Sequence, residues 1–583
     1  MDNRNTIIAI ALSLAILLGW ETFFAPKAPP PTADATATSS ATPPTAPTGT
    51  PSVSSDGGTP VAAPVAAPAE TAAPIAEKRV HVVTPFLHGT ISLTGNRFDD
   101  ITLIKYRETL DPASPEITLL AGANTPKPYH AEWGWIAAES GVALPGPTTE
   151  WTQTSPDATL TETAPLVLTW NNGQGLLFTR TIRADKQYLF TVEQTVQNTG
   201  EKAVTLYPYA LVARLDVHET KGIGFMHEGA LGVFDRTLKE VKYSDLKKKG
   251  REAVESSGGW IGITDKYWLT AVSFDPTLKI SASYNYADAA GRDRFQTDLR
   301  ADPVTAQPGE TKAVTGYLFA GAKELQLLDA YAESPGIPRF DLAIDFGWYY
   351  FLTKPFFLGL RWLHGLLGNF GLAIIAFSTL VRLLMFPIAN KQFKTMNAMK
   401  RLQPEMKRLQ EKYANGDKTK MNQELMELYK REKANPLAGC LPIIIQIPVF
   451  YALYKVLSVT IEMRHAPFYG WIHDLSAADP TTILNLFGLI PFTPPTFLSI
   501  VSIGAWPIIM GVTMFLQQKL SPAPADPMQA RIMMLMPIVI TFVLAPYAAG
   551  LVIYWAWSNT LGILQQWVLL KRTEAKEEAK TTT

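Results

Sequence analysis

An arginine lies inside an apolar stretch of the sequence, where a charged side chain is costly. Arg382 falls within residues 370–390, FGLAIIAFSTLVRLLMFPIAN, and a charge at the centre of a bilayer costs roughly 2.5–3.5 kcal/mol on insertion scales. Ser378 and Thr379 precede Arg382 by about one helical turn, so their hydroxyls share its face. This grouping favours a functional site. The alternative is an anchor: Ile388 lies roughly 9 Å from Arg382 along a helix, and the long arginine side chain would snorkel toward the cytoplasmic headgroups.

The other apolar stretches of the C-terminal half carry amides and hydroxyls but no carboxylates. Polar groups in lipid must face one another or water. An arginine among neutral polar groups indicates a hydrated cationic cavity rather than a buried ion pair, and it disfavours a proton-coupled transporter. The polar residues of these stretches and their ends are Gln446, Gln517, Gln518, Ser558, Asn559, Thr560, Gln565 and Gln566.

No enzyme motif is found in the sequence. Five of the eight histidines fall between residues 79 and 345, but neither His218-Glu219 nor His227-Glu228 continues as H-E-x-x-H. The sequence contains neither a G-x-S-x-G motif nor a P-loop. Its single cysteine, Cys440, excludes an internal disulfide and any multi-cysteine metal site. We therefore expect no catalytic activity, no cofactor and no metal.

Six stretches are long enough, or nearly so, to cross a bilayer. Charged residues make up only 18% of the 583 residues, below the roughly 25% usual in soluble domains. A span needs about 20 apolar residues. The first stretch is interpreted as an uncleaved anchor because bulky aromatic residues stand where a signal peptidase requires small ones; a cleaved signal peptide is the alternative. The predicted spans are 7–24, 369–388, 437–457, 497–516, 532–545 and 551–570, the fifth being short.

The distribution of lysine and arginine predicts the orientation of these spans. Residues 391–435 carry twelve basic and six acidic side chains, whereas the connection 458–496 carries one basic residue, Arg464. Basic loops remain in the cytoplasm. Both termini, including the tail with Lys571 and Arg572, are therefore predicted to be cytoplasmic, and residues 25–345 are predicted to be periplasmic.

The predicted fold is a polytopic α-helical membrane protein with a large antiparallel β-sandwich outside the membrane. Period-two runs such as FTVEQTV, and LVLTW followed by NNGQG and LLFTRTI, are typical of sandwich strands and hairpins. The Ala/Pro/Thr-rich tether contains twelve prolines and cannot bury a core. The expected segments are an anchor (1–24), a disordered tether (25–78), the β-sandwich (79–345), an amphipathic interfacial helix (346–367), a five-helix core (368–572) and a tail (573–583).

The basic connection 391–435 is predicted to form an antiparallel helical hairpin. Apolar residues recur at steps of three and four in both halves, on either side of Asn415-Gly416-Asp417. The excess positive charge fits either docking of an acidic partner or anionic leaflet, or ordinary positive-inside topology. The candidate recruitment residues are Met396, Met399, Lys400, Arg401, Lys407 and Arg408.

The C-terminal part resembles the YidC membrane protein insertases, which are related to the Oxa and Alb proteins. The resemblance rests on Arg382, MNAMKRLQPEMKRLQEKY (396–413), ELYKREKANPLAGCLPIIIQIPVFYALYKVL (427–457) and GLVIYWAWSNTLGILQQ (550–566). Together with the predicted β-domain, the C-terminal part is similar to the form of this family found in Gram-negative bacteria. APYAAGL, before the last span, departs from the tighter turn of the family.

The resemblance implies an insertase and chaperone of the bacterial inner membrane. Five spans would surround a hydrophilic groove open to the cytoplasm and to lipid, with Arg382 at its centre. The implied partners are nascent membrane proteins, the bilayer and the Sec translocon (SecYEG, SecDF), with the ribosome or the signal recognition particle receptor at the hairpin, and no direct contact with nucleic acid. The implied groove residues are Arg382, Thr379, Ser378, Gln446, Tyr554, Trp555 and Asn559.

Two other functions compete with this interpretation. A small-solute transporter would show internal repeats or intramembrane carboxylates, and neither is present in the sequence. A membrane-tethered carbohydrate-binding β-domain would lose all function when residues 79–340 are deleted, whereas an insertase would keep most of it.

Overall fold

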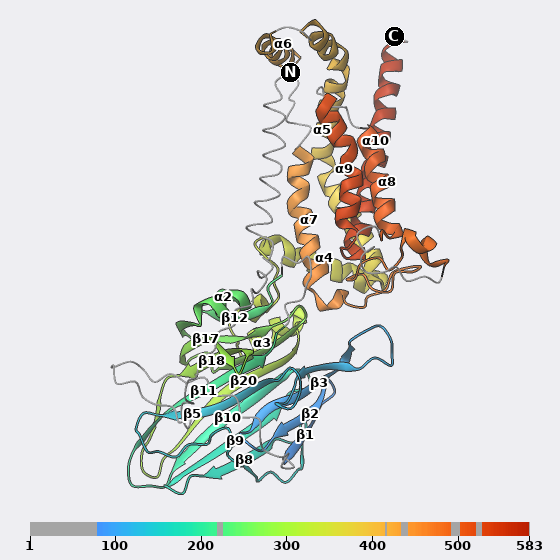
Figure 1. The fold of residues 1–583 in the computed structure, drawn as a ribbon. Helices are drawn as coiled ribbons and strands as arrows, with labels where there is room; N and C mark the ends of the chain where they lie inside the picture. Colours follow the sequence, from blue (N-terminus) through green and yellow to red (C-terminus); the bar gives the residue numbers. More distant parts are fainter. Residues whose placement is uncertain are drawn as a thin grey trace, which may run out of the picture. The chain divides into compact units, whose positions relative to one another are not determined.

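The computed structural model describes residues 78–217, 226–413, 417–432, 441–490, 502–520 and 527–581 (Figure 1). The predicted anchor, the tether up to residue 77, His218 and Cys440 lie outside these residues. The predictions made for them therefore remain predictions.

The N-terminal part is built from two β-sheets. Every strand pairing is antiparallel except that of β1 with β7. In spatial order, the first sheet contains β14 (Arg251–Ser257), β17 (Lys279–Ala289), β18 (Arg292–Ala301), β11 (Val204–Leu215), β5 (Tyr129–Ala137), β3 (Arg97–Arg107), β2 (Leu87–Ser92), β1 (Arg79–Val83) and β7 (Thr159–Leu160), with β19 (Val304–Ala306) beside β11 and β4 (Glu116–Leu120) beside β3. The second sheet contains β13 (Thr237–Lys242), β12 (Gly229–Phe234), β15 (Gly259–Thr264), β16 (Trp268–Phe274), β20 (Thr311–Ala322), β10 (Leu189–Asn198), β9 (Leu176–Ala184), β8 (Leu166–Asn171) and β6 (Thr152–Gln153).

Alternating burial along the strands explains how the two sheets share one core. In β9, every second residue from Leu176 to Ala184 is buried, because successive side chains of a strand point to opposite faces. Phe178 and Ile182 therefore lie in the core. The predicted hairpin of LVLTW and LLFTRTI is confirmed as β8 paired with β9. Among the described residues, three short helical segments accompany the sheets: α2 (Tyr243–Lys249), α3 (Leu325–Glu333) and η1 (Phe340–Ala343).

The C-terminal part is helical (Figure 1). Helix α10 packs against α5, α7 and α8, and α9 packs against α8. The helices are α4 (Tyr350–Leu367), α5 (Phe370–Lys412), α6 (Lys418–Arg431), α7 (Leu441–Val459), α8 (Ala505–Leu520), α9 (Pro527–Leu544) and α10 (Ala549–Thr581), with the short segments η3 (Ile461–Met463) and η4 (Ile483–Gly488) between α7 and α8.

One helix of the described residues, Phe370–Asn390 within α5, is long and apolar enough to cross a membrane. Gln446–Val459 and Ala530–Leu544 are shorter apolar helices. The predicted count of six spans is therefore not confirmed by the structure. Helix α5 also continues without a break into the basic connection, past Pro387 and Pro404, where the sequence suggested a separate helix.

The predicted boundaries of the fourth span are wrong. We expected residues 497–516, but residues 502–504 are not helical, and α8 runs from Ala505 to Leu520. The helix begins at Ala505 because side chains of the preceding loop accept hydrogen bonds from its first amides. Trp506 N donates to Asp479 Oδ2 at 2.8 Å, and Ala505 N donates to Thr481 Oγ1 at 2.9 Å. Such bonds satisfy amides that have no partner within the helix.

The end of α5 and the whole of α6 form a small hairpin with its own apolar core. Leu402 and Met406 pack against Leu428, as the spacing of the apolar residues predicts. Ion pairs flank this core: Lys412 Nζ lies 3.1 Å from Glu424 Oε1, and Arg431 Nη2 lies 3.2 Å from Glu405 Oε2. Exposed pairs of this kind contribute little to stability, so the apolar contacts hold the hairpin together.

A carboxyl group just beyond α7 makes stability depend on pH. Burial, and secondarily the charge of Glu324, raise the pKa of Glu462 from 4.5 to about 7. A raised pKa means that the folded protein binds the proton more tightly than the unfolded chain, so the free energy of unfolding should fall as pH rises from about 5 to 7. Glu462→Gln should remove up to about 3 kcal/mol of this decline.

Denaturant unfolding at several pH values measures this effect. Glu405→Gln, at an exposed position of the hairpin, is the control and should keep the decline. The same pH dependence in Glu462→Gln as in the unmodified chain would disprove the assignment.

Candidate functional site: the polar face between α5 and α10

One face of α10 carries small and polar residues where α10 meets α5. Tyr554, Ser558 and Gly562 recur every four residues, which places them on one side of the helix. Arg382 reaches this face from α5. Its Nη2 donates to the backbone oxygen of Ser558 at 2.8 Å and lies 3.2 Å from the Ser558 hydroxyl. The sequence-predicted arginine is thus directed toward α10.

A second nitrogen of the Arg382 side chain makes no hydrogen bond. Its Nε is buried and has no hydrogen-bond partner, and the same is true of the Ser378 hydroxyl one turn earlier. Within the described parts of the chain, no carboxylate lies at ion-pair distance from Arg382. A partly buried guanidinium without a counter-ion is costly unless water or a ligand supplies acceptors.

Gly562 leaves the space that the guanidinium occupies. A Cβ atom at this position would lie 3.2 Å from Arg382 Nη2 and 2.8 Å from Gln517 Nε2 of α8. A larger side chain must therefore displace one or both of these polar groups. The sequence analysis missed this glycine, although its four-residue spacing from Ser558 was a usable signal.

The family resemblance implies insertion of substrate proteins into the membrane, and Gly562→Leu should reduce that activity about three- to tenfold because the leucine moves the Arg382 guanidinium. The loss corresponds to about 0.7–1.4 kcal/mol. Protease protection of a newly made single-span substrate in proteoliposomes measures the change. Gly365→Leu is the matched control because no atom lies within 4 Å of a Cβ built at Gly365. Equal activity of the two variants would show that the position of the guanidinium is unimportant.

Thr379 is bound to α10 by a tryptophan that the sequence analysis did not select. Trp557 Nε1 donates to Thr379 Oγ1 at 3.0 Å, and the Thr379 hydroxyl donates to the backbone oxygen of Ile375 at 2.8 Å. Because these bonds occupy the hydroxyl, Thr379 acts as a contact between helices. Ser378 has the free hydroxyl.

The other predicted groove residues fall into three separate contacts. Gln446 Nε2 of α7 donates to the Tyr554 hydroxyl at 2.6 Å, one turn of α10 from Ser558. Trp555 packs edge-on against Phe450, with ring centroids 4.8 Å apart. Asn559 Nδ2 lies 3.4 Å from Thr513 Oγ1 of α8. Gln446 and Tyr554 therefore extend the Arg382 face, whereas Trp555 and Asn559 contact α7 and α8, respectively.

The six predicted hairpin residues all lie on α5. Arg401, Lys407 and Arg408 are exposed. The side chains of Met396, Met399 and Lys400 lie outside the described part of the structure.

Comparisons with known proteins identify the family. The family model "60Kd inner membrane protein" matches residues 362–577, and "YidC periplasmic domain" matches residues 79–358. The "Membrane protein insertase YidC" of Methylobacterium nodulans is 47% identical over 99% of this chain and 96% of its own length. The protein of the same name from Sinorhizobium medicae is 49% identical over 99% and 97%. The chain belongs to the YidC family of membrane protein insertases. YidC membership implies a location in the inner membrane, and nascent membrane proteins as substrates.

Solved structures add little to the family assignment. An active YidC insertase crystal structure shares 18% identity with a TM-score of 0.36, covering 84% of this chain and 92% of its own. A galactose mutarotase related enzyme from Lactobacillus acidophilus covers 42% of this chain and 97% of its own, at 8% identity and a TM-score of 0.29. Neither TM-score supports an argument about geometry or activity. The YidC family is not an enzyme class.

Proposed function

We propose that this membrane protein insertase moves the polar segments of its substrates along a hydrated groove lined by the α5–α10 face, with Arg382 as its positive centre. The main support is the buried, unpartnered Nε of Arg382, together with the free hydroxyl of Ser378 one helical turn earlier on α5. Water would satisfy these groups between substrates. During insertion, an acidic or amide side chain of the passing segment would take the place of that water.

This mechanism addresses the main energetic barrier of insertion. Each unsatisfied polar group in hydrocarbon costs several kcal/mol, so a wet path through part of the bilayer lowers the cost of transferring a polar segment. Burial of about 20 apolar residues in lipid then provides the driving force without a nucleotide.

The apolar surface of α9 is suited to release of the substrate helix into lipid. We propose that the substrate leaves along the third and fifth spans, α7 and α9. Ile447 of α7 is 58% exposed, which fits such a path. The exposed apolar residues of α9 are Ile532, Met534, Leu535, Met536, Ile538, Val539, Phe542 and Val543.

The proposal includes the topology and partners expected from the sequence. In this proposal the protein has six spans, both termini lie in the cytoplasm, and residues 25–345 lie in the periplasm. The groove is closed to the periplasm. The exposed cations Arg401, Lys407 and Arg408, together with Met396, Met399 and Lys400, would recruit a ribosome or the signal recognition particle receptor at the hairpin. The Sec translocon (SecYEG, SecDF) would be an optional partner.

Reconstitution with two substrates tests the proposed role of charge. Proteoliposomes containing the full chain should protect a newly made single-span protein that carries an acidic polar segment, whereas protein-free liposomes should not. Replacing the acidic residues of that segment with lysine should reduce protection severalfold, because the lysines and Arg382 repel one another. Equal protection of both substrates would contradict an electrostatic role for Arg382.

A further inference from the structure

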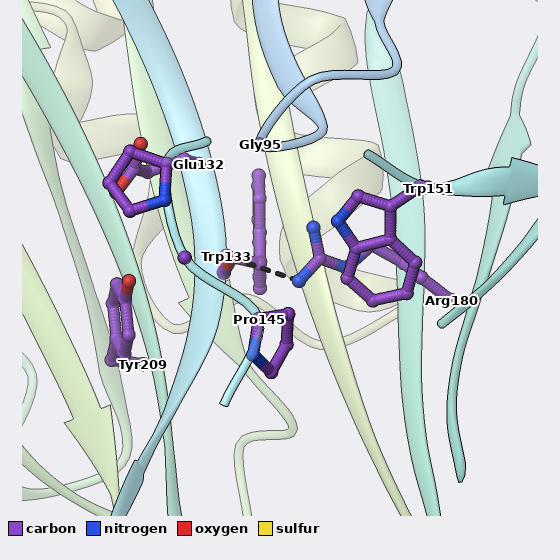
Figure 2. Close-up of a pocket in the computed structure, with 9 residues that line it drawn as sticks. Gly95, Glu132, Trp133, Pro145, Trp151, Arg180 and Tyr209 are labelled. Carbon is purple, nitrogen blue, oxygen red and sulfur yellow. Dashed lines mark hydrogen bonds between the residues drawn. The ribbon is translucent and has the colours of Figure 1, made fainter. Parts of the chain in front are cut away.

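The polar cavity beside Arg180 in the β-domain is too small for a ligand. Figure 2 shows the Arg180 guanidinium close to the indole of Trp151, and its Nη2 donates to the Trp133 backbone oxygen at 2.8 Å. The free space that remains is about 10 Å³, which holds one water. An exposed apolar surface lies elsewhere, in the connection between α7 and α8.

This connection exposes a run of large apolar side chains at η4 and just beyond it. The exposed residues are Ile483, Leu486, Phe487, Leu489 and Ile490. Single exposed apolar residues are common, whereas a contiguous run indicates an interaction surface. No charged residue lies between Asp479 and Lys519, so no charge interrupts the run on its way into α8. The surface therefore suits an uncharged, apolar partner.

Hydrogen bonds join the two ends of the segment 482–503, which we call the 482–503 loop. Ile483 N donates to the Ile503 backbone oxygen at 3.0 Å. The Ser502 hydroxyl donates to Thr482 Oγ1 at 2.8 Å. Thr482 is buried at this junction, so the base of the loop is held in place from both ends.

Asp479 fixes this base against the first turn of α8. Its Oδ2 accepts from Trp506 N at 2.8 Å, and its Oδ1 accepts from Trp471 Nε1 at 3.1 Å and from Thr481 N at 3.0 Å. Tryptophan is enriched where a membrane meets water, because its indole has an apolar ring and a polar N–H. The base therefore has the polarity expected at the level of the lipid headgroups.

Backbone amides at the exposed end of the loop are satisfied within the loop itself. Phe487 N donates to the Thr482 backbone oxygen at 2.8 Å, and Gly488 N donates to Asn485 Oδ1 at 2.9 Å. Ile490 N donates to the Asn485 backbone oxygen at 3.1 Å. Water would satisfy such amides in a solvated loop, but at an apolar surface they need partners from the protein. The loop can therefore enter an apolar environment without exposing these donors.

Helix α8 is too short to span the hydrocarbon by itself. Its 16 residues extend about 24 Å at a rise of 1.5 Å per residue, whereas the hydrocarbon is about 30 Å thick. The shortfall of about 6 Å has to be made up by thinning of the bilayer or by residues that flank the helix. The 482–503 loop leads directly into Ala505, the first residue of α8, so its apolar side chains are placed to fill this shortfall.

We propose that the 482–503 loop dips into the lipid leaflet around the Ala505 end of α8, with its exposed apolar side chains among the upper acyl chains. The partner is a lipid surface, because the loop carries no charge and continues into a helix of a membrane protein. Interfacial segments reach about 5–10 Å into the boundary between headgroups and acyl chains. The inference requires that α8 lies in the membrane. It is independent of Arg382 and of the groove, so its failure leaves the insertion mechanism unchanged.

A spin label at position 489 of the full chain in proteoliposomes tests this contact. Leu489→Cys carries the nitroxide in a Cys440→Ser background and should fold normally, because Leu489 is 84% exposed. Oxygen concentrates in the bilayer and a nickel chelate stays in water, so the ratio of their collision rates with the label reports lipid contact. This ratio should be severalfold higher at position 489 than at Val83→Cys, an apolar residue of β1 that is 52% exposed.

A charge at the exposed end of the loop provides a second test. With the label at Ile490→Cys, the additional substitution Leu489→Asp should lower the oxygen-to-nickel ratio severalfold, because a carboxylate is excluded from the acyl chains. Leu489→Ala is the matched control and should keep most of the ratio. An unchanged ratio in Leu489→Asp, or equal ratios at positions 489 and 83, would overturn the proposal. Protection of position 489 from both reagents would also overturn it, because the loop would then contact protein rather than lipid.

Discussion

Replacing Arg382 with alanine should reduce insertion of a single-span substrate with an acidic polar segment at least tenfold, a loss of about 1.4 kcal/mol or more. Alanine removes the positive charge and leaves the Ser558 backbone oxygen without the donor that lies 2.8 Å away. Arg382→Lys should retain part of the activity because it keeps the charge but loses the fork of donors. Protease protection in proteoliposomes measures both variants.

A cation at a helix end provides the control for the snorkelling alternative. Lys519 lies in the last turn of α8, with its Nζ 4.9 Å from the Phe515 ring centroid, and Lys519→Ala should leave insertion nearly unchanged. Normal insertion by a folded Arg382→Ala variant would reduce Arg382 to an anchor and remove the centre of the proposed groove.

Replacing Asp345 with asparagine should destabilise the protein by about 3–5 kcal/mol, the usual cost of breaking a buried ion pair. Lys455 of α7 is 2% exposed, and its Nζ lies 2.7 Å from Asp345 Oδ2. The same Asp345 oxygen accepts from His227 N at 3.0 Å, and Oδ1 accepts from Gly347 N at 3.1 Å. The carboxylate therefore joins three segments of the chain.

A double-mutant cycle separates this pair from its surroundings. Lys455→Met in the Asp345→Asn background should recover most of the lost stability because it removes the buried charge. Asp329→Asn is the control because Asp329 is 41% exposed and its partner Lys354 also pairs with Asp341. Unfolding in mixed micelles measures the unmodified chain, the two single variants, the double variant and the Asp329→Asn control. Additive losses in the double variant would show that Asp345 and Lys455 are not coupled.

The sequence predicted the β-sandwich and the polar residues of the helical core more accurately than it predicted where the helices begin and end. Buried and exposed side chains alternate along a strand, and the period-two runs of the sequence show this alternation directly. Arg382 and Gln446 were selected because polar residues in apolar stretches are conspicuous. The start of α8 depends on Asp479, which lies 27 residues before Trp506, and no local pattern indicates that contact.

Residues whose role depends on a distant partner were missed. Lys455 was treated as part of an apolar span because its partner, Asp345, precedes it by 110 residues. Trp557 lies in an apolar stretch without a local sign of a polar role, and only its bond to Thr379 places it on the α5–α10 face.

Labelling of a single cysteine at position 558 tests the hydrated groove most directly. Cys440 is the only cysteine of the sequence, so Cys440→Ser gives a background into which Ser558→Cys is introduced. A membrane-impermeant maleimide applied from the cytoplasmic side of sealed vesicles should label position 558. Val539→Cys, at an exposed apolar position of α9, should remain unlabelled. Failure to label position 558 until detergent is added would mean that the Arg382 face is dry, and the proposed insertion path would be wrong.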